Sequence, residues 1–239
     1  MKKLTCTIVA AIFAAFATAN ADLTGSLETS VVSNYTYHGQ VVDRNSVFVP
    51  KLSLQSTLVE GGSLVFSVEQ ILGTKGSTYY RTQYNAGIAL QLGSFTLTPG
   101  YRINAYPDRD KETTQSVTGS LTFNDSGLLP VSLKPTLAFE KATDPRGGSW
   151  YEASVSPGKT FGKLDLTVPI AFGAASNGYF TPSNKDLHYC YASVGVAATL
   201  RVTDKLSLKA GVTGVTTDNR LGNASNNFVQ SQLGVAVSF

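Results

Sequence analysis

Residues 228–239 read FVQSQLGVAVSF. Apolar side chains fill every second position toward the end of this stretch: Leu233, Val235, Val237 and Phe239. The positions that alternate with them include polar side chains: Gln230, Gln232 and Ser238. A β-strand points successive side chains to opposite faces, so this period of two predicts a strand with one apolar and one polar face.

The same alternation recurs along the chain and predicts about twelve strands. The expected ranges are 23–37, 47–59, 64–72, 79–92, 95–106, 113–123, 129–141, 150–157, 163–175, 187–200, 206–217 and 228–239. The facing of 187–200 stays ambiguous. Four prolines inside these ranges lack a backbone donor, so a count of ten or fourteen is also compatible: Pro50, Pro99, Pro135 and Pro169.

The composition suits strands that face lipid on one side and water on the other. Charged residues make up 15% of the chain, against roughly 25% in average globular proteins. Polarity comes instead from Ser, Thr, Asn and Gln. No apolar run after residue 21 is long enough to cross a membrane as a helix, by the rule of about 20 residues per span.

The first 21 residues have the features of a cleaved signal peptide. Lys2 and Lys3 precede an apolar run over 4–16, and Ala19-Asn20-Ala21 has small residues at the positions that a signal peptidase reads. The alternative, a membrane-anchoring helix, needs a longer run. We therefore expect two segments, a signal peptide at 1–21 and a barrel at 22–239.

Cleavage would leave Cys190 as the single cysteine, which excludes an internal disulfide. Loss of the two lysines would lower the formal net charge from +3 to +1. A charge this small gives no argument for nucleic acid as a partner.

The links between the expected strands alternate in length. Short turns lie at 59–63, 92–95 and 201–205, and longer polar links lie at 38–46, 105–112, 141–149, 174–186 and 217–227. This alternation is typical of outer-membrane barrels. Aromatic residues near both ends of the strands predict two interfacial girdles, which include Tyr35, Tyr37 and Trp150 at the long-loop end.

A sheet in hydrocarbon cannot leave an open edge, because each unpaired backbone group costs several kcal/mol. We therefore expect an all-β, closed, antiparallel transmembrane β-barrel in a bacterial outer membrane, surrounded by lipid and lipopolysaccharide. Nearly all of the chain is used by strands and turns, which leaves no residues for a separate plug domain.

Two segments resemble known outer-membrane proteins. An alternating strand that ends in Phe239 is similar to the carboxy-terminal strand read by the outer-membrane barrel assembly machinery, which implies that machinery as a partner. The segment Ser33-Asn34-Tyr35-Thr36-Tyr37-His38-Gly39 resembles the SNYxxRG segment of the TorF-type putative porins, and departs from it at His38, where that family usually has Arg. The resemblance implies a porin.

Strand parity assigns charged side chains to the lumen. The candidate pore-lining residues are Lys51, Glu69, Arg81, Arg102, Lys134, Glu140 and Glu152. They predict a narrow water-filled pore for passive diffusion of small hydrophilic solutes. The other interpretation is a lumen packed shut by salt bridges, in a structural or adhesive barrel that acts through its long loops.

A lipid-modifying barrel enzyme is the weakest alternative. His188 and Cys190 lie two apart on one expected strand and could pair as base and nucleophile. No carboxylate at matching spacing would orient the histidine, and the pair would face lipid. We expect no catalytic residue, no cofactor and no metal site. Asp108 and Asp110 could bridge calcium or lipopolysaccharide, but a solvated loop is the simpler interpretation.

Overall fold

The computed structural model describes residues 23–74, 81–106, 113–125, 131–143, 147–176, 178–179, 188–221 and 223–239. The expected signal peptide and the loop with Asp108 and Asp110 lie outside these ranges. Within them, no helix combines the length and the apolar character that a membrane crossing requires.

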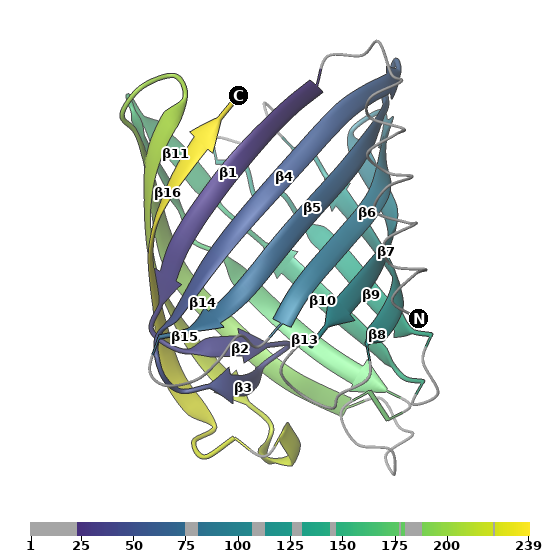
Figure 1. Cartoon of the computed structure of the whole chain (residues 1–239), viewed down its shortest axis with the longest axis vertical. Helices are drawn as coiled ribbons and strands as arrows, with labels where there is room; N and C mark the ends of the chain where they lie inside the picture. Colours follow the sequence, from purple (N-terminus) through teal and green to yellow (C-terminus); the bar gives the residue numbers. More distant parts are fainter. Residues whose placement is uncertain are drawn as a thin grey trace.

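The expected fold is confirmed: the chain forms a closed antiparallel barrel of 12 strands (Figure 1). Most of the wall consists of β1 (Leu23–Val32), β4 (Val47–Val59), β5 (Gly62–Gly73), β6 (Arg81–Leu92), β7 (Phe95–Ala105), β8 (Thr114–Phe123) and β9 (Thr136–Ala142). It continues through β10 (Ser149–Val155), β11 (Gly158–Phe161), β12 (Leu164–Thr167), β13 (Ile170–Ser176), β14 (His188–Arg201), β15 (Leu206–Thr217) and β16 (Asn227–Ser238).

Two of the wall strands are interrupted by proline. Pro157 separates β10 from β11, and Pro169 separates β12 from β13, while both β12 and β13 pair with β14. Each proline removes one ladder donor, so the strand breaks for a few residues and then resumes. Counted with these pairs joined, the wall agrees with the expected number of strands.

The barrel closes between its first and last strands. Thr29 of β1 faces Val235 of β16 in an antiparallel ladder, and Gly25 and Phe239 exchange two backbone hydrogen bonds of 2.9 and 3.0 Å. Both chain ends of the barrel therefore lie at the short-turn end, at the top of Figure 1. The five longer links that the sequence predicted begin and end at the opposite end, but the link from β8 to β9 at the short-turn end is longer than expected.

The outer face carries a belt of exposed aliphatic and aromatic side chains around the barrel. Leu27, Leu137, Phe172, Val194 and Leu233 are 48, 61, 51, 55 and 68% exposed. Apolar surface of this extent is stable only against hydrocarbon, because in water it would cost roughly 25 cal/mol per Å². The barrel therefore spans a bilayer.

The seventh expected strand, 129–141, is shorter than predicted. β9 begins only at Thr136. Lys134 has a φ of +46° and its backbone N–H donates to Asp125 Oδ1 at 3.1 Å, so it belongs to a structured link at the short-turn end. Asp125 also accepts from Ser132 Oγ at 2.5 Å, which fixes this link.

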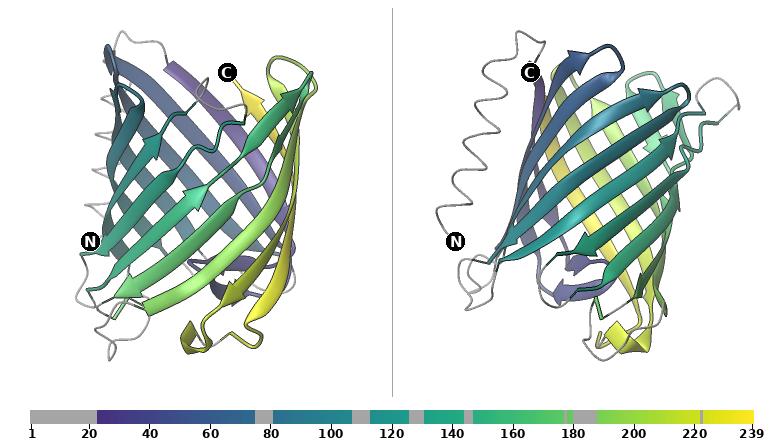
Figure 2. Two further views of the ribbon diagram at one scale, coloured as in Figure 1. Left: turned by 180° about the vertical axis from the view of Figure 1, so that it is seen from behind. Right: turned by 90° about the vertical axis from the view of Figure 1, so that its right-hand side faces the viewer.

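The first expected strand, 23–37, was wrong over its last residues. β1 ends at Val32, and the chain then forms a separate hairpin of β2 (Tyr35–Tyr37) and β3 (Gln40–Asp43). Asn34 is bonded from its side-chain amide to the carbonyl of Val229, at 2.9 Å, which ends the wall ladder. The hairpin lies across the long-loop end of the barrel (Figures 1 and 2).

The ambiguous tenth strand is settled by a β-bulge. In β14, Tyr191 pairs with Gly173 and Tyr189 pairs with the next residue, Ala174, so Cys190 has no partner of its own. A bulge inserts one extra residue and shifts the facing beyond it. Cys190 is fully buried, and the prediction that it faces lipid was wrong.

The aromatic girdle at the long-loop end differs from the prediction. Tyr35, Tyr37 and Trp150 contact groups inside the barrel instead of facing lipid. On the outer face, Phe172 and Tyr189 pack ring against ring with centroids 5.3 Å apart. At the short-turn end, Phe161 and Phe239 are exposed on the rim, as expected.

Candidate functional site

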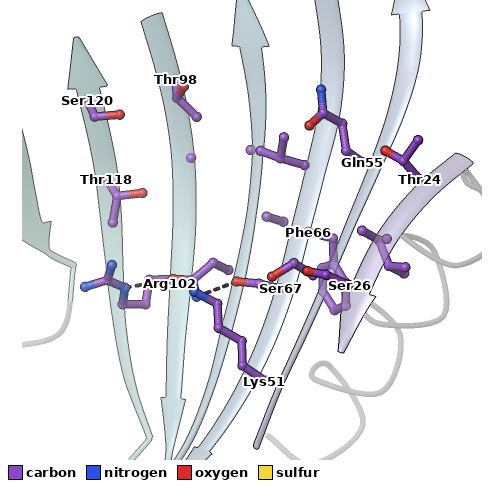
Figure 3. Close-up of a pocket in the computed structure, with 18 of the residues that line it drawn as sticks. Thr24, Ser26, Lys51, Gln55, Phe66, Ser67, Thr98, Arg102, Thr118 and Ser120 are labelled. Carbon is purple, nitrogen blue, oxygen red and sulfur yellow. Dashed lines mark hydrogen bonds between the residues drawn. The ribbon is translucent and has the colours of Figure 1, made fainter. Parts of the chain in front are cut away.

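The inside of the barrel holds a cavity of about 920 Å³. It extends from the short-turn rim, at Thr24 and Ser238, to Trp150 and Glu140 deep in the lumen. Its polar lining is rich in hydroxyl and amide groups: Thr24, Ser26, Ser53, Gln55, Ser67, Asn85, Thr98, Thr118, Ser120 and Ser238. Figure 3 shows several of these side chains on neighbouring strands around one space.

Strand register explains this lining. Ser26, Ser53, Ser67, Asn85 and Arg102 lie opposite one another across β1, β4, β5, β6 and β7. Residues opposite in a ladder point to the same face, so one inward position on each strand makes a continuous polar row. Arg102 Nε donates to Asn85 Oδ1 at 2.8 Å, and Asn85 Nδ2 donates to Ser67 Oγ at 3.1 Å.

Two of the predicted pore-lining residues form an ion pair. Arg102 on β7 contacts Glu140 on β9 through its guanidinium group. The Glu140 side chain is only 3% exposed, so its charge needs partners. Lys51 lines the same cavity and lies opposite Glu69 in the ladder between β4 and β5.

The remaining predicted residues lie elsewhere on the inner surface or outside it. Arg81 is buried and donates to the Tyr35 hydroxyl. Glu152 accepts from the Tyr191 hydroxyl. Lys134 lies in the link before β9, outside the strands of the wall, so its place in a strand was wrong.

Glu140 also holds the tip of the hairpin. Tyr37 Oη donates to Glu140 Oε1 at 3.2 Å, and His38 Nε2 lies 3.2 Å from Glu140 Oε2. The His38 ring packs on Trp150 with centroids 3.8 Å apart. These three aromatic residues were not expected inside the barrel.

The hairpin turns at His38 and Gly39, whose φ values are +51° and +84°. Two consecutive positive φ values are typical of the tight turn that best fits the twist of a two-residue hairpin. A histidine followed by glycine is the signal in the sequence for this turn. The alternation pattern had predicted only a longer polar link from residue 38 to residue 46.

The hairpin carries titratable groups whose pKa values reflect their burial. Burial lowers the pKa of His38 to about 4, and this outweighs the opposite effect of its bond to Glu140. His38 is therefore neutral at pH 7, and its Nε2–H donates to the carboxylate. Burial raises the pKa of Tyr35 to about 12, although Arg81 acts against that rise.

The weak enzymatic candidate has no open site. Cys190 is fully buried and packs with Trp150, Ala175 and Leu221, and its Sγ lies 3.8 Å from the backbone oxygen of His188. A nucleophile needs access for its substrate. Among the residues described, no group of His, Cys, Asp and Glu could hold a metal ion.

No protein-family model and no curated protein matches this chain. Several solved structures match it. The NanC porin is 12% identical over 89% of this chain and 98% of its own, with a TM-score of 0.55. The chain has the fold of outer-membrane porins. The COG4313 outer membrane channel from Pseudomonas putida F1 is 9% identical over 92% of this chain and 96% of its own, with a TM-score of 0.57.

A third similar structure is the KdgM porin in complex with disordered oligogalacturonate. It is 12% identical over 90% of this chain and 99% of its own, with a TM-score of 0.53. At identities this low the likeness establishes the fold, which these proteins use in bacterial outer membranes. These structures are porins or channels and not enzymes.

Proposed function

We propose that the protein is an outer-membrane porin with a narrow water-filled pore for passive diffusion of small hydrophilic solutes. The observation that carries this proposal is the hydroxyl-lined cavity of about 920 Å³ inside the barrel. A barrel of about eight strands can fill its interior with side chains, whereas a barrel with more strands is wider and leaves space inside. An unfilled interior with hydroxyl and amide groups on its wall is suited to water and to solutes that form hydrogen bonds.

The charges of the lumen favour a pore without strong ion selectivity. Arg102 is neutralised by Glu140, and Lys209 Nζ lies 2.5 Å from Glu28 Oε2. Because these four charges are balanced in pairs, they add no field of one sign that would select cations or anions.

The direct test is the conductance of the refolded mature protein in a planar bilayer, together with swelling of liposomes in neutral sugars. We expect discrete steps that grow with salt, and faster swelling with smaller sugars. Circular dichroism of the same sample verifies the fold. A folded barrel that shows no conductance steps at all in long recordings, not even rare ones, would refute the pore and favour the alternative, a barrel that acts through its loops.

The alternative has one observation in its favour, which is the hairpin that crosses the lumen. Cell adhesion and envelope integrity can be measured in a deletion strain that carries either the full protein or a variant without its long loops. A difference between the two would distinguish this alternative from transport. Uptake that fails without any change in adhesion supports the porin.

We further propose membership of the TorF-type putative porins, on the segment from Ser33 to Gly39, and a cleaved signal peptide over 1–21. Assembly through the last strand is the third part of this proposal, since Phe239 lies exposed at the end of that strand. Amino-terminal sequencing of the exported protein tests the cleavage site, and Phe239→Ala should slow assembly in vivo.

A further inference from the structure

The hairpin β2–β3 leaves the wall between β1 and β4 and reaches the opposite wall. The ring order of the wall is β1, β4, β5, β6, β7, β8, β9, β10, β13, β14, β15, β16. The tip contacts Glu140 on β9 and Trp150 on β10. The junction of β9 and β10 is diametrically opposite that of β1 and β4 in this ring, so the hairpin spans the lumen (Figure 1).

The hairpin is held by contacts on both of its flanks. On one flank, the Arg81 guanidinium lies 4.3 Å from the centre of the Tyr37 ring. On the other, Asn223 Nδ2 donates to the Gly39 carbonyl at 2.9 Å and Asn223 Oδ1 accepts from the Val41 N–H at 2.8 Å. The cavity of the lumen ends at Glu140 and Trp150, which the hairpin touches.

The base and the tip of the hairpin are held by different forces. At the base, Tyr35 packs against an apolar cluster of Val32, Val47, Val49 and Ile71. This cluster anchors the hairpin to the wall. The tip, in contrast, is held by hydrogen bonds to Glu140 and Asn223 and by the contact of the His38 ring with Trp150.

The tip also leaves buried polar atoms without partners. In the part of the chain that the structure describes, Arg81 Nε and Trp150 Nε1 have no hydrogen bond. Buried groups without partners reduce the net stability of a contact. If the tip detaches, water can bond to these polar atoms. The tip is therefore suited to detach while the base of the hairpin stays in place.

We propose that the β2–β3 hairpin is a plug that bars the pore at its long-loop end, and that Glu140 is the latch that keeps it docked. This inference rests on the proposed porin function. Solutes pass when the tip leaves Glu140 and Trp150 and swings about its base. Glu140 acts through the hairpin and is a positioning residue.

The test compares the wild type with Glu140→Gln in single-channel recordings at constant salt and pH. Loss of the charge weakens the bonds from Tyr37 and His38, and a charged hydrogen bond is worth about a tenfold change in an equilibrium. We expect the open probability to rise by about tenfold or more. Asp165→Asn is the matched control, since Asp165 pairs with Arg201 at the opposite rim at 3.3 Å and does not touch the hairpin.

A second variant replaces residues 36–42 by a short Gly-Ser turn, which removes the tip and keeps Tyr35 on its cluster in the wall. Large steady openings of this shortened protein, together with rare openings of the wild type, support the plug. Equal conductance of the wild type, Glu140→Gln and the shortened protein overturns the plug and leaves the porin intact. If the shortened protein is folded by circular dichroism and still shows no conductance, the proposed porin function is wrong.

Discussion

Acidification should release the hairpin tip, because His38 is buried in its neutral form. Its pKa is about 4 in the docked state against an ordinary value of 6.5. The released state therefore binds the proton more readily than the docked state does. Docking is fully stabilised above pH 6.5 and loses stability as the pH falls from 6.5 toward 4.

The surroundings of His38 determine how far this effect extends. Glu140 on β9 attracts the proton, whereas Arg102 on β7 and Arg81 on β6 repel it, and the rings of Tyr37 and Trp150 exclude water. With the two pKa values above, docking weakens by about 2 kcal/mol between pH 7 and pH 5. This is roughly a 20-fold fall in the ratio of docked to released hairpins.

The single tryptophan of the chain reports on this equilibrium directly. Trp150 packs on His38 at a centroid distance of 3.8 Å, so release of the tip exposes the indole to the lumen. We expect its emission to shift to the red, and its quenching by acrylamide to increase, between pH 7 and pH 5. Circular dichroism should stay constant over the same range.

His38→Gln is the control, since glutamine can donate to Glu140 but does not titrate. It should abolish the transition or reduce it severalfold. An identical transition in the wild type and in His38→Gln would refute the assignment to His38. A Trp150 signal that is flat from pH 7 to pH 4.5 would refute the depressed pKa as well.

Four further predictions concern the wall. Leu233→Arg places a charge on the lipid face and should destabilise the barrel by about 2–4 kcal/mol if it lies near the midplane, measured by urea unfolding in vesicles; an unchanged midpoint would contradict the facing. In a Cys190→Ser background, a water-soluble maleimide should label Gln232→Cys and spare Leu233→Cys. The reverse pattern would show that the inner and outer faces of this strand are assigned the wrong way round. Cys190 itself should resist that reagent in the folded wild type, so rapid labelling would refute its burial. Gly173→Val should cost about 1–3 kcal/mol, because an added Cβ would overlap the Tyr191 ring; unchanged stability in urea would contradict this close contact.

Much of the wall could be predicted because alternation is local. The apolar positions of the last strand, such as Leu233 and Val235, are exposed on the outside as the period of two requires. Successive links lie at alternate ends of the barrel because neighbouring strands are antiparallel. Pro157 and Pro169 each interrupt a strand without changing the number of strands, because the ladder resumes beyond each of them.

Prediction failed where one residue changed the period. The bulge at Cys190 adds a residue to one strand only, and nothing in an alternation pattern marks it. Lys134 illustrates the second kind of failure. In the sequence, Lys134 alternates regularly with Val131 and Leu133. In the structure, the backbone N–H groups of Leu133 and Lys134 donate to Asp125 instead of to a neighbouring strand.

The sequence by itself determined the class of the fold, a count of about twelve strands and the face that most of these strands turn to lipid, because these follow from the chemistry of adjacent residues. Only the tertiary structure decided what the lumen contains. Closure of the ring brings Glu140 and Trp150 opposite the β1–β4 link, about a hundred residues away from His38 along the chain. Which wall a hairpin reaches depends on the diameter and order of the closed ring, and no local pattern encodes either of them.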